Sequence, residues 1–236
     1  MVALPFAVWL LPFRLDLGAT AFGFAGGVAG GFGLVLFYRA MAMNLIGVVA
    51  PVSAVVAAAI PVMLGVVVGG ERLHLGQVGG IVVGLAAIAL INGGGGAPTK
   101  TARTAVGLAI VAGIGFGLFF VFNHAGSSGG VTTFVSGRFA SALASFCFAL
   151  FSRVSPLPRR SVLPIIAIGG SFDGIGVVLY LFATFHGLLS LSAVLTSFYP
   201  AFTVLCARLF IGEKLAAVQL LGAVLAIAAV ALIAAT

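Results

Sequence analysis

The chain repeats itself at a distance of 142 residues. Gly-Glu-Arg-Leu at 70–73 aligns with Gly-Glu-Lys-Leu at 212–215, and the alignment continues without a gap through 91 and 233. Half of the 22 aligned pairs from 70–91 and 212–233 are identical. A repeat of this length constrains the fold strongly, because both copies are expected to adopt the same supersecondary structure.

The repeated segments are apolar. The chain is 62% hydrophobic and 6% charged, with a mean hydropathy of +1.33. A soluble domain of 236 residues could not hide that much apolar surface, whose hydration costs roughly 25 cal/mol per Å². Several apolar runs are long enough to cross a bilayer as helices, whereas β-barrel strands would alternate in short segments. The composition therefore predicts an all-α, polytopic membrane helix bundle.

Eight transmembrane helices are expected. A short apolar segment, Val2 to Phe13, precedes them and is too short to span a membrane. The glycine-rich linker 92–98 separates two predicted repeats, 1–96 and 97–236. The predicted spans are 17–38, 48–69, 75–92, 104–122, 131–151, 162–183, 188–211 and 215–234.

The repeat distance predicts the size and orientation of each unit. Shifted by 142 residues, the spans 162–183 and 215–234 fall on spans of the first half. The span 104–122 has no counterpart, and 131–151 overlaps only residues 1–9. We therefore expect a five-helix unit whose first copy is N-terminally incomplete, lacking its first one to two helices. Since five is odd, consecutive units enter the membrane from opposite sides, which predicts inverted repeats and the alternating access of secondary transporters.

The repeated motif also resembles a known family. The Gly-Glu-(Arg/Lys)-Leu motif is followed by Gln77 or Gln219 and then by Gly80 or Gly222. This pattern is similar to the EamA-type unit of the drug/metabolite transporter superfamily. The resemblance implies ten helices in two inverted halves around a central cavity, in a multi-pass protein of the cell (plasma or inner) membrane. It also implies export of small organic metabolites or drugs.

Two other functions stay open on the same scaffold: a lipid-linked carrier translocase, and a non-transporting truncated membrane subunit. The expected partners are a small-molecule substrate and the lipid bilayer, and a homodimer is the assembly to test. A nucleic-acid partner is not expected despite the net charge of +7, because the basic residues occupy short connections and form no run with interleaved aromatics. No enzyme motif with supporting context occurs, and neither a cofactor nor a metal is expected.

Polar side chains inside the spans are the candidate substrate or coupling residues. Asp173 lies near the middle of its span, where a charge costs about 2.5–3.5 kcal/mol and is usually functional. It is either a proton- or cation-binding carboxylate, or a cap for a helix break at the flanking glycines. Arg138 either pairs with Asp173, attracts an anionic substrate or extends to the membrane interface. Tyr38 and Tyr180, which the repeat aligns, and Tyr199 are the further candidates.

Overall fold

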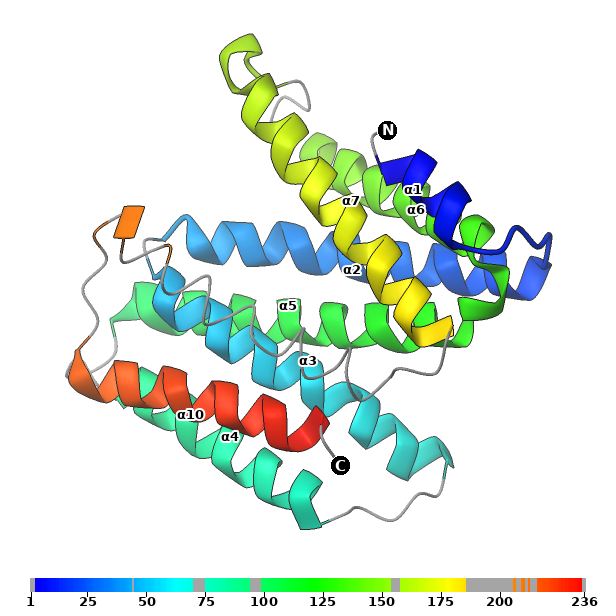
Figure 1. The fold of residues 1–236 in the computed structure, drawn as a ribbon. Helices are drawn as coiled ribbons and strands as arrows, with labels where there is room; N and C mark the ends of the chain where they lie inside the picture. Colours follow the sequence, from blue (N-terminus) through cyan, green and yellow to red (C-terminus); the bar gives the residue numbers. More distant parts are fainter. Residues whose placement is uncertain are drawn as a thin grey trace. The chain divides into compact units, whose positions relative to one another are not determined.

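The fold of the described residues is entirely helical, as the composition predicts (Figure 1). The computed structural model describes residues 3–43, 45–69, 75–93, 99–153, 158–185, 206, 209–210, 212 and 216–234. The α-helices among them are α1 (Ala3–Leu10), α2 (Leu17–Met41), α3 (Ile46–Gly69), α4 (Leu75–Gly93), α5 (Lys100–Ala125), α6 (Val131–Phe151), α7 (Leu163–Phe185) and α10 (Ala217–Ala234). Two short 3₁₀ helices, η1 (Ser127–Gly129) and η2 (Arg160–Val162), precede α6 and α7.

These helices confirm the predicted membrane bundle. Four helical segments are long and apolar enough to cross a membrane: Leu17–Met41, Lys100–Ala125, Val131–Phe151 and Arg160–Phe182. Shorter apolar stretches, at Ile46–Pro61, Val78–Ile88 and Ala217–Leu232, lie in α3, α4 and α10. The eight-residue α1 corresponds to the predicted short N-terminal segment. Most of the predicted span 188–211 lies outside the described residues.

Two compact units make up the chain. One comprises Met1–Phe32 with Phe119–Leu189, and the other comprises Gly33–Leu118 with Ser190–Thr236. Helices α2 and α5 contribute residues to both. Each contact unit combines segments from both predicted repeats, so the repeat boundary at 96/97 stays a prediction from the sequence.

Glycines bring α2 and α6 together in the first unit. A methyl group at Gly27 would lie 2.8 Å from the Cα atom of Gly137, and one at Gly31 would lie 2.9 Å from that of Ser141. Only glycine permits backbones to approach this closely, as in small-residue helix interfaces of membrane proteins. The spacing of Gly23, Gly27 and Gly31, one helical turn apart, predicts such a close-packing face, and the structure confirms it.

The segment between α1 and α2 is tied to the start of α6. The N–H of Val131 donates to the carbonyl oxygen of Pro12 over 3.0 Å. Gly130 lies against Pro12. Its φ of +55° is a backbone conformation that favours glycine. Helix α2 begins after Asp16, whose Oδ1 accepts hydrogen bonds from the backbone N–H groups of Gly18 (2.8 Å) and Ala19 (3.2 Å). This arrangement is an N-cap.

Helix α1 packs on α7. Its Ala3 and Ala7 share a buried cluster with Phe134 of α6 and with Val178 and Leu181 of α7. In the second unit, α3 packs with α2 and α5 around Phe37, Val49, Val52, Ala105 and Ala109, among others.

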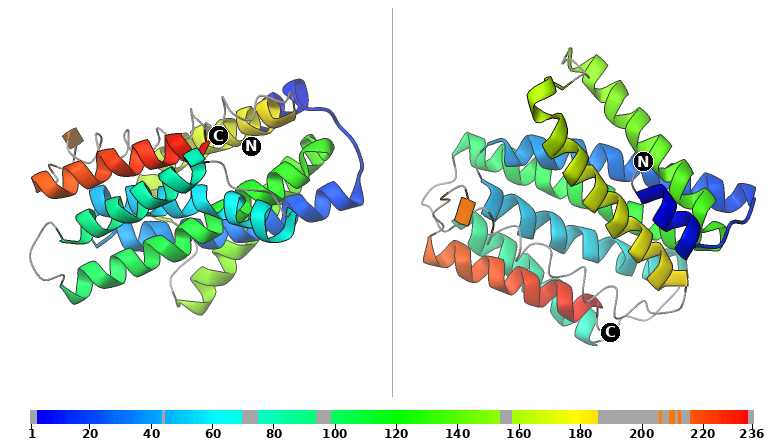
Figure 2. Two further views of the ribbon diagram at one scale, coloured as in Figure 1. Left: turned by 90° about the horizontal axis from the view of Figure 1, so that it is seen from below. Right: turned by 45° about the horizontal axis from the view of Figure 1, so that its top comes forward.

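The last helices of the two predicted repeats, α4 and α10, pack against each other in the second unit (Figures 1 and 2). A methyl group at Gly84 would lie 3.5 Å from the Cβ atom of Ala229. Ala87 and Ala226, which the repeat aligns with Ala229 and Gly84, share one buried cluster. A two-fold axis between the helices would exchange these two pairs, which supports the inverted relation that the sequence predicts.

Candidate functional site

Asp173 and Arg138 form an ion pair within the first unit. The Nη1 group of Arg138 on α6 donates to Oδ2 of Asp173 on α7. Of the alternatives for Arg138, the structure shows pairing. Helix α7 runs without interruption from Leu163 to Phe185, so the hypothesis of a helix break capped by Asp173 is wrong. The backbone of α7 keeps its helical hydrogen bonds because hydrocarbon offers no other partners for them.

Both charges of the pair lie inside helices that are predicted to span the membrane, where a charge is costly. Asp173 is close to the midpoint of α7, and Arg138 lies two turns into α6. Pairing cancels the net charge and satisfies one carboxylate oxygen, which offsets part of the desolvation cost of both ions. The side chains are still 33% (Arg138) and 55% (Asp173) exposed in the isolated chain.

An aromatic ring supports the arginine. The guanidinium carbon of Arg138 lies 5.6 Å from the ring centroid of Phe134, within the range of a cation–π interaction. Phe134 is only 5% exposed. Neither charge nor the repeat marks Phe134 in the sequence, although its position four residues before Arg138 places both side chains on one helix face.

Glycines flank Asp173 on its own face of α7. Gly169, Asp173, Gly176 and Tyr180 are spaced by four, three and four residues, which aligns them along one side of a helix. A methyl group at Gly169 or Gly176 would meet no atom of the described residues within 4 Å, whereas one at Gly174 would lie 2.7 Å from the Cβ atom of Ala3. Packing within the described structure thus explains Gly174, and the other two glycines leave open space beside the ion pair.

The structure describes two of the three candidate tyrosines, and these two belong to different units. Tyr180 shares the Asp173 face, and its ring centroid lies 5.2 Å from that of Phe120 on α5. Tyr38 belongs to the second unit, near the end of α2, with its ring centroid 5.9 Å from that of Phe37. Tyr199 lies outside the described residues. A role in substrate binding or coupling stays a prediction for all three tyrosines, as it does for the ion pair.

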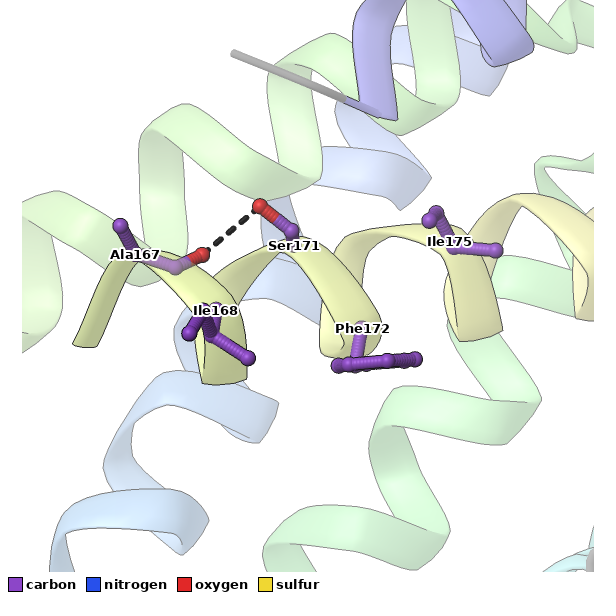
Figure 3. A pocket seen from close by; sticks show the side chains of 5 residues that line it. All are labelled: Ala167, Ile168, Ser171, Phe172 and Ile175. Carbon is purple, nitrogen blue, oxygen red and sulfur yellow. Dashed lines mark hydrogen bonds between the residues drawn. The ribbon is translucent and has the colours of Figure 1, made fainter. Parts of the chain in front are cut away.

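A shallow pocket of about 270 Å³ lies on another face of α7. Its lining is apolar, with Ile168, Phe172 and Ile175 along the helix (Figure 3). The one polar side chain there, Ser171, donates its hydroxyl to the carbonyl oxygen of Ala167 over 2.7 Å. The spacing of these residues turns them away from Asp173, so this pocket is separate from the ion pair and suits hydrocarbon. Among the described residues, no group of three or more His, Cys, Asp or Glu side chains could hold a metal ion.

Comparison with known proteins gives the family. No curated protein matches the chain. The profile of the EamA-like transporter family matches residues 103–235, which is more than half of the chain. The matched range includes the candidate ion pair and lies within the second predicted repeat. Members of this family are membrane transporters, in agreement with the multi-pass helical bundle. The chain therefore belongs to the EamA-like transporter family.

Proposed function

We propose that this protein is a secondary transporter that exports small organic solutes across the cell membrane by alternating access. One observation carries the proposal beyond the family: an ion pair connects two predicted membrane helices, Arg138 on α6 and Asp173 on α7. An ion pair that only held the two helices together would carry a large desolvation cost inside the membrane. Intramembrane ion pairs more often mark the path of a substrate or a proton.

Three partners compete for the carboxylate of Asp173. Asp173 can hold the guanidinium of Arg138, a proton or a cationic group of the solute. Because these partners exclude one another, solute binding and proton binding alternate. Export that is driven by an inward proton gradient requires this alternation. The open space at Gly169 and Gly176 leaves room for a solute beside the carboxylate, and Arg138 then becomes available for an anionic group of the same molecule.

Reconstituted protein tests the proposal. Proteoliposomes with an imposed pH gradient are supplied with radiolabelled choline, lysine, alanine or succinate, which represent cationic, zwitterionic and anionic solutes. We expect Asp173→Asn to abolish gradient-driven accumulation of the transported solute while passive exchange survives. Asp16→Asn is the matched control, since Asp16 is the only other aspartate and lies before α2. Undiminished proton-driven accumulation by the Asp173→Asn protein would contradict the proposed role of the pair.

A lipid-linked carrier translocase is the second candidate, and the apolar pocket at Ile168 and Phe172 favours it. This pocket would hold a hydrocarbon chain while the polar head group passes the ion pair. The distinguishing experiment uses vesicles with a fluorescent polyprenyl phosphate and a membrane-impermeant quencher. Protein-dependent movement of the fluorescent lipid between leaflets, without transport of any water-soluble probe, would select the translocase. Failure of both assays would favour a non-transporting subunit.

A further inference from the structure

We propose that Phe134 is a positioning residue that holds the guanidinium of Arg138 at the depth of Asp173 when the carboxylate is neutralised. This inference rests on the proposed function, because it concerns the step in which Asp173 exchanges Arg138 for a proton or a solute. Phe134 would then have a role in the transport cycle in addition to its packing in the buried cluster.

The geometry around Phe134 supports this role. Side chains on a helix lean toward its N-terminus, so Arg138 reaches back over the residue one turn earlier. The guanidinium carbon lies 5.6 Å from the Phe134 ring centroid. The ring shares a buried cluster with Ala7 of α1 and Val178 of α7. It is therefore held between its own helix, α6, and these two neighbours. It forms a rigid surface on which the guanidinium rests.

The second step concerns charge. When Asp173 is protonated or engaged by a solute, Arg138 loses its counter-ion inside the membrane. An arginine in that state tends to extend to the nearer interface, where water and lipid phosphates solvate it. The ring face of Phe134 attracts the cation independently of Asp173, and a desolvated contact of this kind shifts the balance between the two positions by about tenfold or more. Arg138 thus stays in place to recover Asp173 at the end of the cycle.

The test measures where Arg138 lies when its partner is neutral, and it needs no transported solute. Asp173→Asn protein in lipid bilayers is treated with the water-soluble arginine reagent p-hydroxyphenylglyoxal. Mass spectrometry then gives the modification rate of Arg138 relative to that of Arg14, a loop residue in the same molecule. In the Asp173→Asn background we expect Phe134→Leu to raise this ratio by about tenfold, because the lost ring face lets the guanidinium reach water.

Three further variants make the result specific. Phe134→Tyr keeps the ring and is expected to leave the ratio low. Phe134→Met removes the ring but keeps a long, unbranched apolar side chain, and is expected to raise the ratio. Phe139→Leu is the control, since Phe139 lies on the same helix but is 64% exposed. Equal ratios for Phe134→Leu, Phe134→Met and Phe139→Leu would overturn the proposal, as would a Phe134→Tyr ratio as high as that of Phe134→Leu. Neither result would affect the transport proposal, which the proteoliposome assay tests separately.

Discussion

Two glycine-to-alanine substitutions should change stability in opposite directions, although both glycines lie inside apolar helices. Gly27 lies at the contact of α2 with α6, and Gly169 lies on the face of α7 that carries Asp173. A methyl group at position 27 would press on the Gly137 carbonyl and lie 2.8 Å from the Gly137 Cα atom. At position 169 the same methyl group would meet no atom within 4 Å in the part of the chain that the structure describes.

The expected magnitudes follow from these contacts. Overpacking in a close-packed interior typically costs 1–3 kcal/mol, and the atoms of Gly137 are backbone atoms that yield only if a helix moves. Alanine gains up to about 1 kcal/mol over glycine in a helix interior. The two terms oppose each other at position 27, so Gly27→Ala should lower the free energy of unfolding by about 1 kcal/mol. Gly169→Ala should raise it by up to about 1 kcal/mol, since only the propensity term acts there.

Reversible unfolding in mixed micelles with increasing dodecyl sulfate measures both values. The single tryptophan, Trp9, lies on α1 in the same contact unit as Gly27 and Gly169, and its fluorescence follows the transition. A Gly27→Ala protein as stable as the parent would refute the close approach of α2 and α6. A marked loss of stability in Gly169→Ala would show that another segment or a second chain covers that face.

Three further predictions follow from the same geometry. In a variant without native cysteines, Gly176→Cys should react with a charged, membrane-impermeant thiol reagent and Phe172→Cys, on the pocket face, should not; equal labelling would place both faces in one environment. Asp16→Ala should lower the free energy of unfolding by about 1 kcal/mol in the micelle titration, because it removes the N-cap of α2, and an unchanged midpoint would contradict that role. Gly174→Leu should displace α1, seen as a shift of Trp9 emission; an unshifted spectrum would show that α1 docks elsewhere.

Much of the fold could be predicted from the sequence. Apolar runs long enough to cross a bilayer predict helices, because the membrane admits few other backbone structures. The observed bounds of α3 and α6 lie within two residues of the predicted spans 48–69 and 131–151. The repeat likewise indicated the family that the profile match confirms. These features depend on hydropathy and motif spacing, which need no knowledge of three-dimensional contacts.

The candidate site could be predicted only in part. Asp173 and Arg138 stand out in the sequence because they are charges inside apolar spans, yet their pairing remained one alternative among several. Only the packing of α6 beside α7 decided it. The alternative of a helix break at Asp173 was wrong, since glycine weakens helices in water but keeps its backbone hydrogen bonds in a membrane span.

The remaining features were decided by tertiary structure alone. Gly169 and Gly174 are both glycines inside one apolar span, and their sequence does not show which of them packs against another helix. Whether a methyl group meets a backbone, a neighbouring side chain or open space depends on which helix lies opposite. The contact of Phe134 with Arg138 likewise depends on a side-chain direction that α1 and α7 fix by burying the ring. Contacts between segments distant in sequence arise only from packing, and they determine which faces of these helices are available to a solute.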